Sequence, residues 1–251
     1  KFQDCKSLIF IFIIKMEVKE YLDKMMKIQN LFLNYLDDDM NQSNFMDLIK
    51  YIDDQKIRQN KHQLTSILHL FSSIVDYHYR TIYFFDKFFK IILFLKDDLM
   101  KNYSNLEIFN FFCNNCKIIL FLIEEKIIYV DYLITSMCLY FTFNDYIQKK
   151  TFSSKYYCLF PEIKPFLDKN CEVYLDSQTQ EDIKEQRKVE YADNYILQLV
   201  QKDLIDEFIS YINRTGTSNS TIINPSIFET NSFLIDKQPT LIEYASFFGS
   251  I

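Results

Sequence analysis

Residues 104–126 read SNLEIFNFFCNNCKIILFLIEEK, and this stretch indicates the fold more directly than any other. Ser104, followed three residues later by Glu107, forms a capping box, in which each side chain can bond to the backbone of the other residue. Apolar spacing after it predicts a short helix over residues 106–112, a break over 113–116 and a second helix over 117–126. Two antiparallel helices joined by a tight turn cannot bury their own apolar face, so such units stack.

A second stretch matches the first without gaps. Residues 240–250 (TLIEYASFFGS) align with residues 104–114 (SNLEIFNFFCN): both begin with a hydroxyl residue, have Glu three positions later and carry Phe-Phe at the same place. Residues 195–216 fit the same plan as helices over 195–202 and 206–213, with Gly216 available to end the second helix. The sequence therefore predicts an internal repeat of helix pairs.

Helical spacing of apolar residues extends through most of the remaining chain. It predicts further helices over residues 18–36, 44–52, 64–78 and 83–95. One or two more are expected within 127–160. The predicted fold class is all-α, a helical bundle or solenoid of antiparallel helix pairs that becomes degenerate ankyrin-like toward the C-terminus.

Composition excludes several classes of protein. The 251 residues include two Gly and four Pro, too few for hairpin-rich β folds or glycine-rich phosphate loops. The net charge of −6, without a basic cluster, argues against nucleic-acid binding. Six scattered cysteines favour reduced, mostly buried thiols and hence an intracellular, cytoplasmic protein.

Three places carry residues typical of redox or metal-binding sites. Cys113 and Cys116 form a CxxC, either a redox pair, half of a zinc site or two small residues in a turn, and the missing second ligand pair favours the turn. His62 and His69 are about 10 Å apart along a helix, too far to share a metal. Residues 37–48 begin like a calcium loop but lack its Gly and final Glu. We therefore predict no catalytic residue, cofactor-binding residue, metal ligand or cofactor, and hence no enzyme.

Two apolar stretches were considered as membrane spans. Residues 8–14 are too short for a bilayer, which takes about 20 residues, and residues 127–143 carry a charge and three tyrosines, which favours a buried helix. The first Met is Met16, and residues 1–15 are interpreted as a non-native or disordered leader.

The stretch 240–250 resembles the start of an ankyrin repeat, T-P-L-H-x-A-A-x-x-G-H. The matching residues occupy the Thr, Leu, first Ala, second Ala and Gly places and are Thr240, Ile242, Ala245, Ser246 and Gly249. Leu241 and Glu243 replace the Pro and His, which puts the usual Thr–His hydrogen bond of that family in doubt.

From Met16 onward the chain resembles a large protist family of ankyrin-repeat proteins, in which a helical region of unknown function precedes regular repeats. The likeness lies in DDQKIR (53–58), YSNLEIFNFF (103–112), ILFLIEEK (119–126), PEIKPF (161–166) and PSIFETNSFLID (225–236). It implies an N-terminal helical domain over 16–170 and an incomplete ankyrin region over 191–251. Between them, residues 176–188 (DSQTQEDIKEQRK) are polar and dense in charge, which predicts a polar linker or solvated helix over 171–190.

The resemblance implies a non-enzymatic scaffold that binds a protein partner, with neither nucleic acid nor membrane as its ligand. One alternative is a structural N-terminal cap of a longer repeat array, and another is an unrecognised helical enzyme. Because the family's repeats continue beyond the position of Ile251, we expect Phe247, Phe248 and Ile251 to be poorly covered and the last dozen residues to be loosely held.

Overall fold

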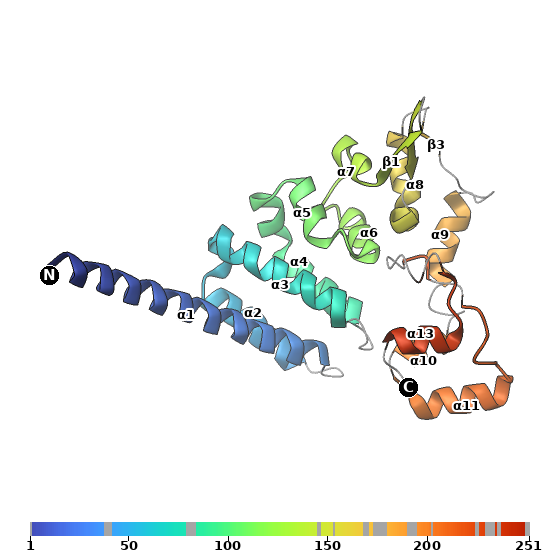
Figure 1. Ribbon diagram of the computed structural model, residues 1–251, viewed down its shortest axis with the longest axis horizontal. Coiled ribbons are helices and arrows are strands. Elements are labelled where there is room, and N and C mark those ends of the chain that lie inside the picture. Colours follow the sequence, from blue (N-terminus) through green and yellow to red (C-terminus); the bar gives the residue numbers. More distant parts are fainter. Residues whose placement is uncertain are drawn as a thin grey trace. The chain divides into compact units, whose positions relative to one another are not determined.

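The computed structural model is mostly helical, which confirms the main feature of the predicted fold (Figure 1). The chain divides into two compact units, residues 1–95 and 96–251. The structure describes the following residues: 2–37, 42–78, 84–144, 147–152, 154–167, 171–172, 180–189, 195–201, 203–223, 226–228, 234 and 237–248.

The first unit is built from the helices that apolar spacing predicted. They are α1 (Phe2–Asp37), α2 (Gln42–Asp54), the short 3-10 helix η1 (Ile57–Gln59), α3 (Lys61–His78) and the first part of α4 (Phe84–Asn102). The apolar stripe of α1 enters the core at Phe32, whose ring lies 4.3 Å from that of Phe71 and 6.1 Å from that of Phe88. The backbone of α1 is already helical from Phe2, within the segment interpreted as a leader.

A buried lysine joins α4 to the end of α1. Lys87 Nζ donates to the carbonyl oxygen of Leu36 at 2.8 Å and lies 5.8 Å from the centre of the Tyr35 ring. The Tyr35 hydroxyl in turn donates to the carbonyl of Lys87 at 3.3 Å, and burial raises the pKa of Tyr35 to about 12. A cation at the C-terminus of a helix satisfies the carbonyls that the helix leaves unpaired.

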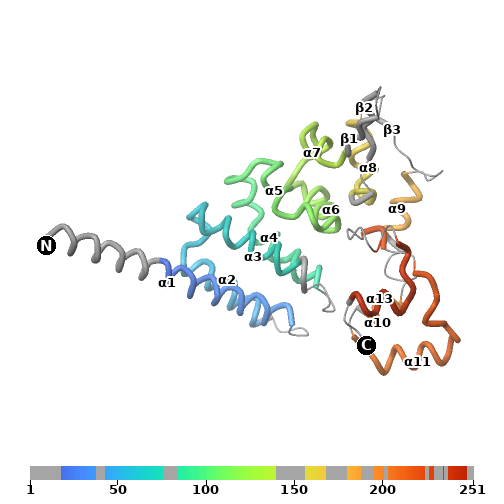
Figure 2. The backbone as a smooth tube through the Cα atoms, viewed as in Figure 1, coloured from blue at the N-terminus to red at the C-terminus, as the bar shows by residue number. Residues whose placement is uncertain are grey.

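The second unit begins with the predicted helix pair. After the end of α4, α5 (Asn105–Phe112) and α6 (Cys116–Glu124) follow each other across a tight turn (Figure 2). Asn115 caps α6 by accepting from the backbone N–H of Ile118 at 3.2 Å. Both helices turn apolar side chains inward, including Ile108, Phe109, Phe112, Ile119 and Leu122. Residues 104–126 thus fold as predicted.

A small sheet follows that the sequence analysis did not predict. After α7 (Tyr132–Met137), strands β1 (Leu139–Asn144) and β2 (Ile147–Phe152) pair antiparallel, with Leu139 opposite Phe152. The short β3 (Cys171–Glu172) runs parallel to β2. The two main strands are rich in aromatic and β-branched residues, which favour extended backbone. The segment 127–160 does contain a helix, as expected, but the buried helix expected over 127–143 is wrong at 139–143, which belongs to strand β1.

The chain then returns to helices. It forms η2 (Ser154–Leu159), α8 (Phe160–Ile163), η3 (Lys164–Phe166), α9 (Gln180–Val189), α10 (Tyr195–Gln201), α11 (Ile205–Thr215) and α13 (Leu241–Phe248). Gly216 ends α11 with φ of +68°, the left-handed conformation that the predicted helix end requires. The predicted pair over 195–216 is therefore present as α10 and α11, which contact each other.

Candidate functional site

The ankyrin-like residues lie on and beside α13, which packs against α10. Thr240 forms a complete capping box with Glu243: its backbone N–H and its hydroxyl each donate to the Glu243 carboxylate at 2.8 Å. These bonds from Thr240 lower the pKa of Glu243 below its ordinary value.

The other ankyrin-like residues are unevenly covered. Ile242 is 56% exposed, although it stands at the Leu place of the motif, while Leu241 and Tyr244 are buried. Ala245 is half-buried, and Ser246 is exposed, with its hydroxyl donating to the Ile242 carbonyl at 2.8 Å. Gly249 and Ile251 lie outside the described residues, as does the side chain of Phe248. Phe247 is 42% exposed, which confirms the expected poor cover at that residue.

The two copies of the repeat motif share local geometry. Ser104 and Glu107 form the same capping box, with the Ser104 N–H donating to the Glu107 carboxylate at 2.8 Å. At the next matched position, Ile108 and Tyr244 are both buried. The copies differ two positions after Glu, where Phe109 is buried and Ala245 is half-buried. The internal match in sequence is therefore also a match in helix start and in the burial of the residue that follows Glu.

The group formed by α10, α11 and α13 carries exposed apolar residues. Ile205 and Ile209 on α11 are 50% and 51% exposed, and α11 has no buried residue although its apolar and polar residues lie on opposite faces. The helix is held to α10 through the Tyr195–Tyr211 ring contact at 5.6 Å. The loop after α11 also contacts the start of α13, where Ile222 forms an isolated antiparallel bridge with Thr240.

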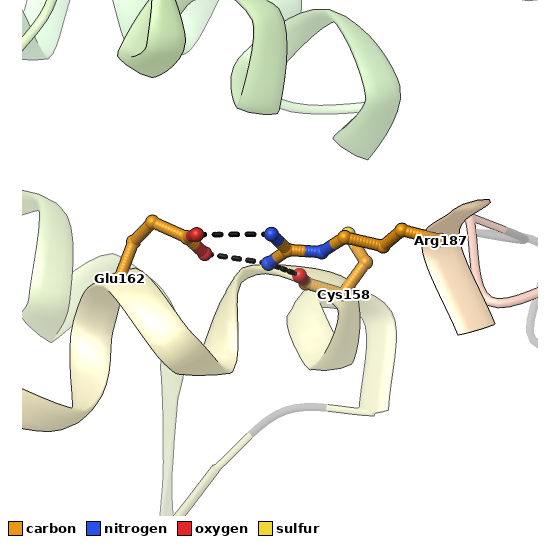
Figure 3. Close-up of polar contacts among 3 residues, drawn as sticks. All are labelled: Cys158, Glu162 and Arg187. Atoms are coloured by element: carbon orange, nitrogen blue, oxygen red, sulfur yellow. Dashed lines mark hydrogen bonds and ion pairs between the residues drawn. The ribbon is translucent and has the colours of Figure 1, made fainter. Parts of the chain in front are cut away.

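A buried ion pair lies elsewhere in the second unit, between α9 and α8. Figure 3 shows Arg187 reaching from α9 to Glu162, with paired bonds of 2.9 and 2.5 Å to the two carboxylate oxygens. The same guanidinium donates to the carbonyl oxygen of Cys158. The side chains are only 10% and 21% exposed. A paired, partly buried Arg–carboxylate contact fixes geometry more strongly than an exposed one.

Cys158, whose backbone carbonyl accepts from Arg187, carries a buried thiol. Cys116 is also fully buried, and the two residues belong to contacting elements, η2 and α6. Burial raises the pKa of the Cys158 thiol well above its ordinary value; the contact with Cys116 acts in the same direction, while the charge of Arg187 acts against it. Burial also raises the pKa of Glu124, which Arg187 partly offsets.

The structure shows where the residues that resemble redox and metal sites lie. Cys113 and Cys116 stand on either side of the α5–α6 turn, as the turn interpretation requires, and Cys113 is half-buried. His62 and His69 lie on the exposed surface of α3. Residues 38–41 of the calcium-like stretch are outside the described residues. Within the described ranges, no three metal-ligating side chains converge, and no helix combines the length and apolar character needed to cross a membrane.

Sequence reasoning missed the contacts of Arg187. Residues 176–188 were interpreted as a polar linker or solvated helix because of their charge density, and α9 confirms the helix. However, Ile183 is completely buried and Arg187 is paired, so one face of α9 is anchored. The spacing of four residues between them was the available signal, because it places both on one face.

Comparison with known proteins identifies no relative: no family model, no curated protein and no solved structure matches this chain.

Proposed function

We propose that this protein is a non-enzymatic interaction scaffold of ankyrin type, which uses helix pairs of its second unit to bind a protein partner. The observation that carries the proposal is the partly uncovered apolar face of α11, where Ile205 and Ile209 are each half exposed. An amphipathic helix normally buries its apolar face, and an exposed one marks an interaction surface.

The kind of partner follows from the shape of this face. Ile205 and Ile209 are four residues apart, so both lie on one face of α11. A partner that matches such spacing is another amphipathic helix, which docks through apolar residues at the same intervals. The repeated helix-pair plan of α5–α6 and α10–α11 supports a scaffold, because stacked pairs present continuous surfaces.

The test starts from the full chain used as bait, followed by affinity measurements with the purified partner. We expect Ile209→Asp to weaken binding at least about tenfold, because a charge placed in an apolar contact must be desolvated. Ser210→Asp is the matched control: it adds the same charge to the next, exposed position, which points about 100° away around the helix. That control is expected to bind within about twofold of the unaltered chain.

Equal affinity for the Ile209→Asp and Ser210→Asp variants would refute the α11 face as the recognition surface. If no partner binds the unaltered chain, the structural cap becomes the better hypothesis. A cap has a different signature: adding residues 16–213 to regular repeats would increase their solubility without adding any binding activity.

A further inference from the structure

Two thiols from distant parts of the sequence meet in the core of the second unit. Cys116 is the first residue of α6 and Cys158 belongs to η2, which contacts α6. Both are fully buried, and the Cys116 side chain lies near enough to Cys158 to help raise the pKa of the Cys158 thiol. A disulfide needs two cysteines at close range, and two buried thiols on contacting elements are the pair in this unit to consider for one.

The CxxC spacing would have indicated a different pair. Cys113 is only half-buried, and its thiol donates to Asn114 Oδ1 at 4.0 Å. The carbonyl of Cys113 accepts from the Tyr156 hydroxyl at 3.2 Å, which ties the α5–α6 turn to η2. Tertiary packing therefore brings Cys116 to Cys158, forty-two positions away in the sequence, and not only to its neighbour in the turn.

Helix α9 fastens the segment that carries Cys158. Arg187 bonds to the Cys158 carbonyl and to Glu162, four residues later, while Ile183 on the same helix is fully buried. Arg187 Nε is buried with no hydrogen-bond partner among the described residues. One donor of the guanidinium therefore lacks a hydrogen bond while α9 is packed in place. Local opening of α9 would hydrate that donor and break the bond from Arg187 to the Cys158 carbonyl.

We propose that Cys116 and Cys158 form an oxidisable dithiol that α9 shields from solvent. We call the arrangement with α9 packed in place the closed state, and the Arg187–Glu162 ion pair that holds it the latch. When α9 opens, the Cys158 thiolate attacks one sulfur of a low-molecular-weight disulfide, and the other half leaves as a thiolate. Cys116, after losing its proton to water, attacks Cys158 in the mixed disulfide and releases the second thiol. The protein loses two electrons and two protons, the small disulfide becomes two thiols, and the new bond joins α6 to η2.

The closed state accounts for protection from this reaction. The attacking species is a thiolate, and burial keeps Cys158 protonated and out of contact with reagents. Oxidation should therefore proceed through the open state, so its rate reports the population of that state. This inference is independent of partner binding, because it concerns the interior of the unit and not the face of α11.

The experiment uses the full chain with 2-hydroxyethyl disulfide as the oxidant and peptide mass mapping as the readout. We expect a linked peptide that joins Cys116 to Cys158, absent from Cys158→Ser and unchanged in Cys113→Ser. Arg187→Gln and Glu162→Gln should each accelerate formation of that link by about tenfold to a hundredfold, since each removes a charged hydrogen bond from the latch. Arg214→Gln, an exchange of the same kind on exposed α11, should leave the rate unchanged.

Buried Cys138 reports global unfolding in the same samples. Its alkylation should stay slow in both latch variants. A Cys113–Cys116 link in place of the Cys116–Cys158 link, latch variants that oxidise no faster than the unaltered chain, or an equal acceleration at Cys138 would each overturn the proposal.

Discussion

Gly216 shows how one residue can set the end of a helix. Its φ of +68° is costly for residues with a Cβ, and its N–H donates to the carbonyl of Ile212 at 2.8 Å to close α11. A Cβ built at this position would meet no atom within 4 Å. The requirement for glycine is therefore one of backbone conformation and not of space.

A substitution at Gly216 can therefore test backbone strain separately from steric contact. We expect Gly216→Ala to lower the free energy of unfolding by about 1 kcal/mol, measured by urea titration, because the left-handed backbone becomes strained. Gly216→Asn should lose less, since Asn adopts this conformation more readily. A larger loss in the Asn variant than in the Ala variant would contradict the backbone explanation.

Glu243 gives a pH-dependent prediction. Bonds from Thr240 lower the pKa of the Glu243 carboxyl, so folding favours its charged form. The contribution to the stability of α13 is present above the ordinary Glu pKa and is lost as the pH falls through the lower, folded value. Carbon-detected NMR titration should show the depressed pKa, and Thr240→Val should return it only part of the way, because the backbone N–H of residue 240 still donates. An unchanged pKa in that variant would assign the whole shift to the backbone bond.

At the scale of elements, the start of α5 is fixed by side chains close in sequence. Ser104 accepts from the Glu107 N–H at 3.3 Å while Glu107 accepts from Ser104. We expect Ser104→Ala to cost about 1 kcal/mol in urea unfolding and Ser104→Asp to retain most of the stability. Combining Ser104→Ala with Glu107→Ala should cost less than the sum of the single changes, because the two side chains cap the helix together. Strict additivity would argue against a reciprocal box.

Helix α1 depends instead on contacts far along the chain. Phe32 is completely buried between Phe71 and Phe88, so Phe32→Ala should lower the stability of the first unit by about 3–5 kcal/mol. Met26 on the same helix is 60% exposed, and Met26→Ala should change stability by less than about 0.5 kcal/mol. Denaturant unfolding of both variants tests the comparison, and similar losses would place the core of this unit elsewhere.

Over the whole molecule, protection should follow how many apolar side chains each helix buries. Helix α6 buries Cys116, Ile118, Ile119, Leu120 and Leu122, whereas the described part of α13 buries Leu241 and Tyr244. We expect amide hydrogen exchange to be markedly slower over residues 119–123 than over 241–248. Equal protection would show that α13 is held more firmly than its described contacts explain.

The capping boxes, the helix ends and most of the helices could be predicted because they depend on residues three or four positions apart. Ser104, Thr240 and Gly216 act on backbone within one turn of themselves, so their roles are encoded locally. The β1–β2 pair was missed because a short apolar run suits a helix or a strand until its neighbours are known. The encounters of Arg187 with Glu162 and of Cys116 with Cys158 join residues 25 and 42 positions apart. No local pattern specifies such pairs, because they form only where packed helices exclude water and bring distant side chains together.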